Sequence, residues 1–237
     1  MSRALKISLS LVVVFAAALA VFLMVDRSGS PDAAAAEQAA TDPASIAVRE
    51  NSHRLNSVPD GRVTFVEFLD FECEACRSAY PAIEQLREEY GDRVSFVARY
   101  FPITSHFNAE RAARAVEAAA QQGGFEAMYQ RMYETQAQWG EQQVPQDELF
   151  RSFAVEQGLD MSAFDAAYTD PATLARIEAD VADGIALGVQ GTPTFFLNGT
   201  KIEPTTYGDL ADALDAADLV DQVQDHEVRE VDLLERA

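Results

Sequence analysis

Two cysteines, Cys73 and Cys76, restrict the fold of this chain more than any other feature, because they are the only two in 237 residues and lie three positions apart. An apolar run over residues 62–69 precedes them, and a helical pattern follows them to about Tyr90. The run predicts a buried strand, and Gly91 is a helix stop signal. Without a further thiol the chain cannot build a disulfide framework or a cysteine-rich zinc site, so its stability must come from an ordinary apolar core.

The segments that follow alternate between strand and helix in a definite order. A second apolar run at 94–101 completes a strand–helix–strand unit, and a long stretch of helical pattern comes after it. Strands return on both sides of Asn198-Gly199, the dipeptide most typical of a tight hairpin, and a closing helix is predicted at 207–217. Because neither β-containing part could bury both of its faces alone, the two must share one sheet. This predicts an α/β fold with a helical insertion at about 104–188. The helices of the insertion are predicted at 109–121, 125–138, 146–157, 162–168 and 171–187.

The N-terminal residues 1–27 carry an export signal of one of two kinds. Residues 7–25 contain 19 residues without a charged side chain, which as a helix would be roughly 28 Å long, close to the ~30 Å apolar core of a bilayer. Arg3 and Lys6 precede this run, and positive charge on that side predicts that the rest of the chain lies outside the cytoplasm. A transmembrane anchor is favoured over a cleaved signal peptide, for which the small-x-small sequence Ala18-Leu19-Ala20 would be the cleavage site.

A linker and an acidic tail flank the predicted domain at 45–218. Residues 28–44 contain two prolines, an alanine run and few large apolar side chains, and predict a flexible linker. Residues 219–237 are rich in acids and predict a surface helix, with a docking tail as the alternative. The net charge of −21 argues against binding to nucleic acid, because the phosphate backbone requires Lys and Arg.

A Cys-x-x-Cys at the start of a helix in an exported chain is a redox site by its mechanism. Unpaired backbone N–H groups and the positive end of the helix dipole stabilise a thiolate there. We therefore expect Cys73 to be an exposed nucleophile and Cys76, about one turn further, to be a buried resolving thiol. The alternatives are an inert structural disulfide and half of a metal site shared by two chains. With only three histidines in the chain, we expect neither a metal nor a cofactor.

Residues 65–76, which end in the two cysteines, and residues 191–196 resemble the DsbA-like branch of the thioredoxin superfamily. The segment 99–102, followed by His106 and an alanine-rich helix, resembles its membrane-anchored or secreted bacterial members. The likeness covers about residues 45–218. It implies a thioredoxin fold with a helical insertion and thiol–disulfide exchange with unfolded or reduced exported proteins. It also implies re-oxidation by a membrane quinone-linked thiol oxidoreductase.

Three further residues match functional positions of that family. Pro193 matches its cis-proline, which would set Thr192 against Cys73 and leave a backbone edge open to an extended substrate segment. Glu67, in the middle of the first strand, matches a buried acid, for which burial predicts a raised pKa. A neutral carboxyl group near Cys76 could then move a proton during exchange. The alternatives are a trans proline in a loop and a glutamate that faces solvent at a strand edge.

The dipeptide between the cysteines, Glu74-Ala75, departs from the Pro-His pair of the better-known family members. Glu74 places a like charge beside the thiolate, which predicts a higher pKa for Cys73 and a weaker oxidant than a Pro-His protein. No histidine occupies the position that stabilises the thiolate in those proteins. We interpret His106 as a structural residue.

The residues and the resemblance predict an exported, membrane-tethered thiol–disulfide oxidoreductase whose domain lies on the extracytoplasmic side of the cell membrane. We expect an oxidase that introduces disulfides through Cys73 and Cys76. The alternatives are an extracytoplasmic disulfide reductase, a protein secreted after signal cleavage, and a non-enzymatic tethered factor that binds a client or assembles a metal site.

Overall fold

The computed structural model describes residues 42–56, 58 and 63–235, with side chains up to residue 223. The expected anchor or signal at 1–27 and the expected linker up to residue 41 lie outside these ranges. In the part of the chain that is described, no helix is both long enough and apolar enough to cross a bilayer.

The core of the domain is one five-stranded sheet in the order β1-β3-β2-β4-β5. β2 (Val63–Leu69) and β3 (Val94–Tyr100) are parallel, and β4 (Thr194–Leu197) pairs antiparallel with both β2 and β5 (Thr200–Ile202). The two β-containing parts therefore share a sheet, as predicted. The short edge strand β1 (His53–Arg54) pairs antiparallel with β3 and is an addition that the sequence pattern does not reveal.

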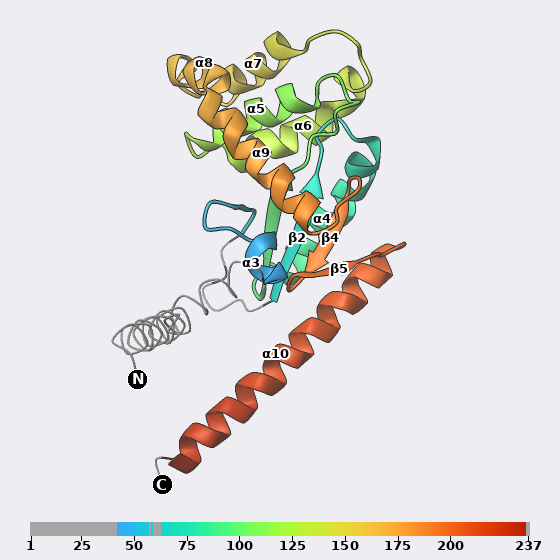
Figure 1. The fold of residues 1–237 in the computed structure, drawn as a ribbon, viewed down its shortest axis with the longest axis vertical. Helices are drawn as coiled ribbons and strands as arrows, with labels where there is room; N and C mark the ends of the chain where they lie inside the picture. The colour runs from blue at the N-terminus through green and yellow to red at the C-terminus, as the bar shows by residue number, and fades with distance from the viewer. Residues whose placement is uncertain (1–41, 57, 59–62, 236–237) are drawn as a thin grey trace, which may run out of the picture. The chain divides into compact units, whose positions relative to one another are not determined.

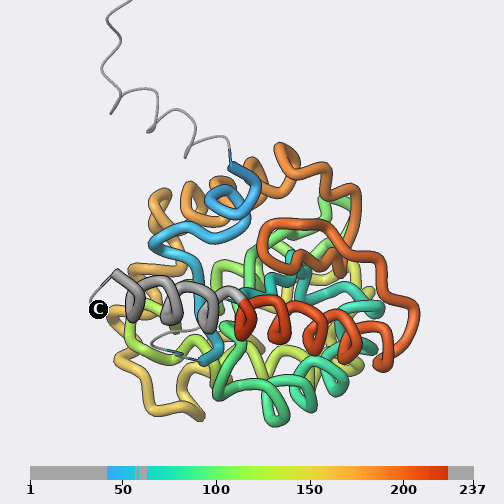
Figure 2. The backbone as a smooth tube through the Cα atoms, turned by 90° about the horizontal axis from the view of Figure 1, so that it is seen from below, coloured from blue at the N-terminus to red at the C-terminus, as the bar shows by residue number. Residues whose placement is uncertain are grey.

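Helices cover both faces of this sheet (Figures 1 and 2). α4 (Glu74–Tyr90) and the first turns of α10 (Tyr207–Glu235) pack on one face. α3 (Pro43–Ala47) and the end of α9 (Pro171–Ala186) lie side by side on the other. Successive residues of a strand point to opposite faces, and the alternation along β2 places Glu67 on the side of α4.

The helical insertion forms the second part of the domain and is drawn above the sheet in Figure 1. It begins after β3 and ends before β4, which confirms the insertion predicted at about 104–188. Its helices are α5 (Ala109–Ala120), α6 (Phe125–Trp139), α7 (Asp147–Glu156), α8 (Met161–Thr169) and α9. α5 contacts each of the other four. Six of its alanines are buried, and side chains this small allow neighbouring helices to approach closely.

The domain begins two residues before the expected boundary at 45. α3 takes in the last residues of the segment 28–44 that was expected as a linker, and Ala47 is fully buried. Arg99 of β3 donates hydrogen bonds to the carbonyl oxygens of Ile46 and Ala47 at 2.9 and 2.6 Å. These bonds join residues more than fifty positions apart in the chain, so no local pattern indicates them.

α10 is longer than the closing helix predicted at 207–217. Its first turns are anchored by Leu210 and Leu214, which are buried against the sheet. The helix then continues to Glu235, through the segment expected as a separate tail at 219–237. No break in the helix marks the boundary expected after residue 218, and the helix expected beyond it is present.

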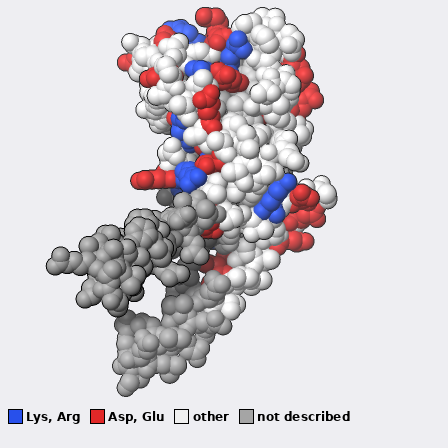
Figure 3. All heavy atoms as spheres, in the orientation of Figure 1, with Lys and Arg blue, Asp and Glu red and all other residues white. Residues whose placement is uncertain are grey.

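The surface carries the acidic excess of the sequence. On the face drawn in Figure 3, acidic side chains lie over the helical insertion and over the lower part of the domain, with basic side chains between them. Several basic side chains are paired with acids, as Arg151 is with Asp165. Because the chain has 39 acidic and 18 basic residues, such pairing leaves a net negative surface.

Candidate active site

Cys73 and Cys76 lie where β2 ends and α4 begins. Cys73 is the N-cap residue of α4, and Cys76 is in the first turn of the helix. Both are present as free thiols. Cys76 is fully buried and Cys73 is 7% exposed, so Cys73 is the more accessible of the two but less exposed than expected. The loop before β4 covers it, since the Sγ of Cys73 lies 3.3 Å from the carbonyl oxygen of Thr192, to which its thiol form donates a hydrogen bond.

The two thiols have opposite acid–base character. The hydrogen bond from Cys76, with smaller contributions from Thr192 and the backbone N–H groups of Ala75 and Cys76, outweighs burial and lowers the pKa of Cys73 to about 5. Burial, the hydrogen bond to Cys73 and the charge of Glu67 raise the pKa of Cys76 well above its ordinary value. At neutral pH Cys73 is therefore a thiolate, and Cys76 is the thiol that donates to it.

The loop that faces Cys73 contains the Thr192–Pro193 peptide bond, which is cis, as the resemblance implies. β4 starts directly after it, with Thr194 paired to Phe68 of β2, so the sheet holds this loop beside the cysteines. The hydroxyl group of Thr192 is buried and has no hydrogen-bond partner in the described part of the chain. Thr192 is also one of the groups that lower the pKa of Cys73 and so favour its thiolate. The loop thus contributes a carbonyl oxygen and a hydroxyl group to the surroundings of Cys73.

Glu67 is buried in the middle of β2, on the side of α4, with 4% of its surface exposed. The alternative of a solvent-facing glutamate is therefore wrong. Burial, assisted by the charges of Cys73 and Glu84, raises the pKa of Glu67 to about 8. Its carboxyl group is protonated at neutral pH, and the charge that it gains on ionisation is felt by Cys76.

Asp70, just after β2, anchors the loop that follows β3. Its carboxylate accepts hydrogen bonds from the backbone N–H groups of Glu72 and Ile103 and from Nδ1 of His106, at 2.8, 2.9 and 2.6 Å. This partnership agrees with a structural role for His106. The sequence shows only an acid at the end of an apolar run, because two of its three partners are more than thirty positions away.

Glu72 and Gln136 fasten the same turn to the helical insertion. Glu72 is 1% exposed and accepts hydrogen bonds from the backbone N–H groups of Asn108 and Glu141. Gln136 of α6 donates a hydrogen bond to the carbonyl oxygen of Cys73 at 2.9 Å. No motif in the sequence marks either residue. Through them the insertion sets the position of the N-cap that carries the nucleophile.

Glu74 and Ala75 lie exposed in the first turn of α4. Glu74 is not among the groups that contribute most to the pKa of Cys73, which is governed by hydrogen bonds. The predicted effect of its charge therefore stays a prediction, and a small one. Within the described ranges, no three His, Cys, Asp or Glu side chains gather as ligands for a metal ion.

A Cys-x-x-Cys at the start of the helix after β2, next to a cis-proline loop and on a mixed sheet with a helical insertion, is the arrangement of a thiol–disulfide oxidoreductase. A family model described as thioredoxin matches residues 58–216. The match covers more than half of the chain, and the chain belongs to this thioredoxin family.

Solved structures agree with this assignment. A thioredoxin-like oxidoreductase from Silicibacter pomeroyi is 30% identical, with a TM-score of 0.61 over 73% of this chain and 95% of its own. Wolbachia pipientis α-DsbA1 is 17% identical, with a TM-score of 0.68 over 77% of this chain and 98% of its own. BdbD from Bacillus subtilis is 20% identical, with a TM-score of 0.63 over 70% and 92%. The last two likenesses establish the fold, which is that of DsbA-like proteins.

Curated relatives share one region with this chain. A protein named Na(+)/H(+) antiporter NhaA from Herminiimonas arsenicoxydans is 36% identical over 143 residues, which are 60% of this chain and 22% of that protein. One from Salinispora tropica is 39% identical over 140 residues, or 59% and 20%. The chain thus spans about a fifth of the length of these relatives, and ion transport by the whole proteins is not carried over.

Proposed function

We propose that this protein is an oxidase that introduces disulfides into exported proteins through Cys73 and Cys76. The observation that carries the direction is the low pKa of Cys73, about 5, beside a Cys76 thiol whose pKa is raised. A stabilised thiolate favours the reduced form of the pair, and this makes the corresponding disulfide a stronger oxidant.

In the oxidising direction, a substrate thiolate attacks the Sγ of Cys73 in the Cys73–Cys76 disulfide. A bond forms between the substrate sulfur and Cys73, and the electron pair of the broken disulfide leaves on Cys76, which takes up a proton. A second substrate thiolate then attacks the substrate sulfur of the mixed disulfide and releases Cys73 as a thiolate. The substrate loses two electrons, and the cysteine pair gains them.

Two neighbours of the cysteines have roles in this sequence of steps. Glu67, protonated at neutral pH because its pKa is raised to about 8, supplies the proton to the leaving thiolate of Cys76 and recovers it in the reverse step. Thr192, ahead of Pro193, offers its backbone to an extended substrate segment, which pairs with this edge as an added strand.

The uncharged run at 7–25 supports a membrane tether, with residues 28–42 as a spacer and the oxidoreductase domain on the extracytoplasmic side. In that location the reduced pair is re-oxidised by a membrane quinone-linked thiol oxidoreductase. Its substrates there are reduced or unfolded exported proteins.

The test uses the full chain and a peptide with two cysteines. The oxidised protein is mixed with the reduced peptide, and formation of the peptide disulfide is followed by mass spectrometry. Cys73→Ala abolishes the reaction because the attacked sulfur is missing. Cys76→Ser, incubated with the oxidised peptide, accumulates a mixed disulfide at Cys73 because no second thiol displaces the peptide. Equal oxidation by Cys73→Ala and by the wild type would contradict the proposal.

The direction is tested separately by the reduction potential of the Cys73–Cys76 pair in glutathione buffers. A value near about −120 mV is expected of a strong oxidase. A value near about −270 mV, the range of thioredoxin, would reassign the protein as a reductase while leaving the roles of the cysteines intact.

A further inference from the structure

His106, in the loop after β3, is joined to the turn that carries the nucleophile. Its Nδ1 lies 2.6 Å from Oδ2 of Asp70, whose side chain is wholly buried. The main-chain carbonyl oxygen of the same Asp70 accepts a hydrogen bond from the backbone N–H of Cys73 at 3.2 Å. The imidazole ring is therefore held at the base of the turn that ends at Cys73, and 21% of its side chain is exposed.

The proton shared by His106 and Asp70 belongs to His106. Burial opposes a charge on His106, but the hydrogen bond and charge of Asp70, with smaller contributions from Cys73 and Glu72, outweigh it and raise its pKa. Burial also raises the pKa of Asp70. The Asp70 carboxylate, however, accepts hydrogen bonds from the backbone N–H groups of Glu72 and Ile103 in addition to the one from the imidazole. Because three donors favour the charged form of the carboxyl group, Asp70 is the ionised partner.

We propose that protonated His106 is a positioning residue for disulfide exchange: its positive charge offsets the buried Asp70 carboxylate and stabilises the Cys73 thiolate, in place of the histidine that Glu74-Ala75 lacks. The inference rests on the proposed role of Cys73 as the nucleophile. Without a proton on His106, the carboxylate of Asp70 would repel the thiolate at the end of the same turn.

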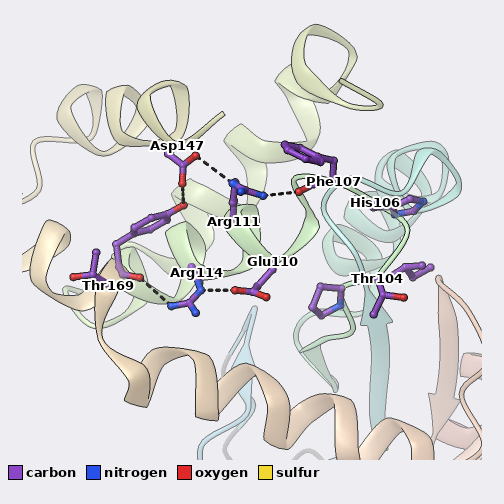
Figure 4. Close-up of a pocket in the computed structure, with 11 residues that line it drawn as sticks. Thr104, His106, Phe107, Glu110, Arg111, Arg114, Asp147 and Thr169 are labelled. Atoms are coloured by element: carbon purple, nitrogen blue, oxygen red, sulfur yellow. Dashed lines mark hydrogen bonds and ion pairs between the residues drawn. The ribbon is translucent and has the colours of Figure 1, made fainter. Parts of the chain in front are cut away.

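The other charges near His106 are paired among themselves. Glu110 and Arg114 of α5 form one ion pair at 2.8 Å, and Arg111 of α5 and Asp147 of α7 form another at 3.2 Å. Figure 4 shows both pairs apart from His106 in the pocket that these side chains line. The ionisable groups that face His106 from the active-site turn are Asp70, Glu72 and Cys73.

The decisive measurement is the titration of His106 in the full chain by nuclear magnetic resonance, in the oxidised and the reduced state. The charge of the Cys73 thiolate is present only in the reduced state, so we expect the pKa of His106 to be higher there by about half a pH unit. His53 is the internal control. It lies 2.6 Å from Glu117 with 18% of its side chain exposed, close to the values for His106, but it stacks on Phe125 away from the cysteines. The ring signals of His53 are expected to be the same in both redox states.

Variants test the same coupling from the side of Cys73. His106→Asn keeps a side-chain N–H donor where Nδ1 lies but removes the charge, and we expect it to raise the pKa of Cys73 by the same half unit, because the coupling is reciprocal. The matched control is His53→Gln, which preserves a donor at Nε2, the atom that bonds to Glu117. It is expected to leave the pKa of Cys73 unchanged. The pKa is read from the ultraviolet absorbance of the thiolate.

Each outcome has a definite meaning. A titration of His106 that is identical in the two redox states overturns the inference, and so does a His106→Asn protein whose Cys73 pKa equals that of the wild type. An equal rise with His53→Gln also overturns it, since the effect would then not be local. If wild-type Cys73 shows no lowered pKa, the proposed nucleophile fails first, and the inference fails with it.

Discussion

The two faces of the central sheet both bury ionisable side chains, but in opposite states. On the face covered by α3 and α9, Arg99 is fully buried, with Nε 2.8 Å from Asp180 and Nη2 2.6 Å from Asp183. On the face covered by α4, Glu67 is buried without an ion-pair partner in the described part of the chain, and its pKa is raised to about 8. Next to it, Cys73 has a lowered pKa.

This difference separates structural from chemical use of buried charge. A buried charge with opposite charges and hydrogen bonds around it stays ionised and fastens elements together, as Arg99 fastens α3 and α9 to β3. A buried acid without such partners exchanges its proton near neutral pH, where it can assist a reaction. The same sheet therefore supports a rigid face and a reactive face.

The largest effect is expected from breaking the paired face. Arg99→Met takes one partner from the buried carboxylate of Asp180 and one from the partly buried carboxylate of Asp183. It also leaves the carbonyl oxygens at the end of α3 without their donor. We expect a loss of about 3–5 kcal/mol in the free energy of unfolding, measured in urea. The control is Arg151→Met, which removes a bidentate pair with Asp165 that is nearly half exposed, and it is expected to leave the free energy of unfolding nearly unchanged. Equal losses in the free energy of unfolding in the two variants would contradict the expected difference between a buried and an exposed ion pair.

On the reactive face, Glu67→Gln is expected to stabilise the protein at high pH. The folded-state pKa of about 8 lies above the ordinary 4.5. Ionisation of Glu67 therefore lowers the free energy of unfolding of the wild type increasingly as the pH rises from 4.5, and the full loss is reached above about 8. At pH 9 the variant should be more stable by about 2–4 kcal/mol, and at pH 4 the two should be equal.

The same variant should exchange disulfides at least about 10-fold more slowly at neutral pH, because the proton for Cys76 is missing. Urea unfolding at the two pH values and peptide oxidation are the measurements. A stability difference that does not change with pH would contradict the raised pKa of Glu67.

The fold could be predicted where local signals determine it. Hydrophobic periodicity and turn residues indicated the main strands and helices to within about two residues, except for the C-terminal end of α10, and the hairpin at Asn198-Gly199 has the positive φ angles typical of that dipeptide. β1 and α3 could not be predicted, because distant residues hold them. β1 is two residues long and exists through its pairing with β3, and α3 depends on Arg99.

The candidate site divides in the same way. The cysteines, the buried glutamate and the cis-proline loop follow from motifs that a sequence displays. Asp70, Glu72 and Gln136 do not, because each acts through partners thirty or more positions away. The low exposure of Cys73 has the same origin, since the covering Thr192 is 119 positions away. Local sequence patterns therefore do not predict the parts of the site that depend on long-range hydrogen bonds.

A smaller effect is expected at the loop that faces the nucleophile. Thr192→Val keeps the shape of the side chain but removes the hydroxyl group that favours the thiolate, and we expect the pKa of Cys73 to rise by about one unit with little change in stability. Thr194→Val is the matched control, because the Thr194 hydroxyl donates to the carbonyl oxygen of Gly191 at 2.7 Å. It should cost about 1 kcal/mol of stability and leave Cys73 unchanged. The reverse pattern would show that Thr192 is a structural residue.

The smallest effect concerns Glu74, the exposed acid between the cysteines. Removing its charge in Glu74→Gln should lower the pKa of Cys73 by a few tenths of a unit at low salt, and the difference should vanish near 1 M salt, where the screening length is about 3 Å. Glu88→Gln, at an exposed site about four turns further along α4, is the control and should leave Cys73 unchanged.

A shift of a whole unit in Glu74→Gln would mean that the dipeptide dominates the site. A few tenths would mean that buried hydrogen bonds from Cys76 and Thr192 outweigh an exposed like charge by their lower local dielectric. The acidic dipeptide is then compatible with an oxidising disulfide, because buried groups on the reactive face determine the pKa of Cys73.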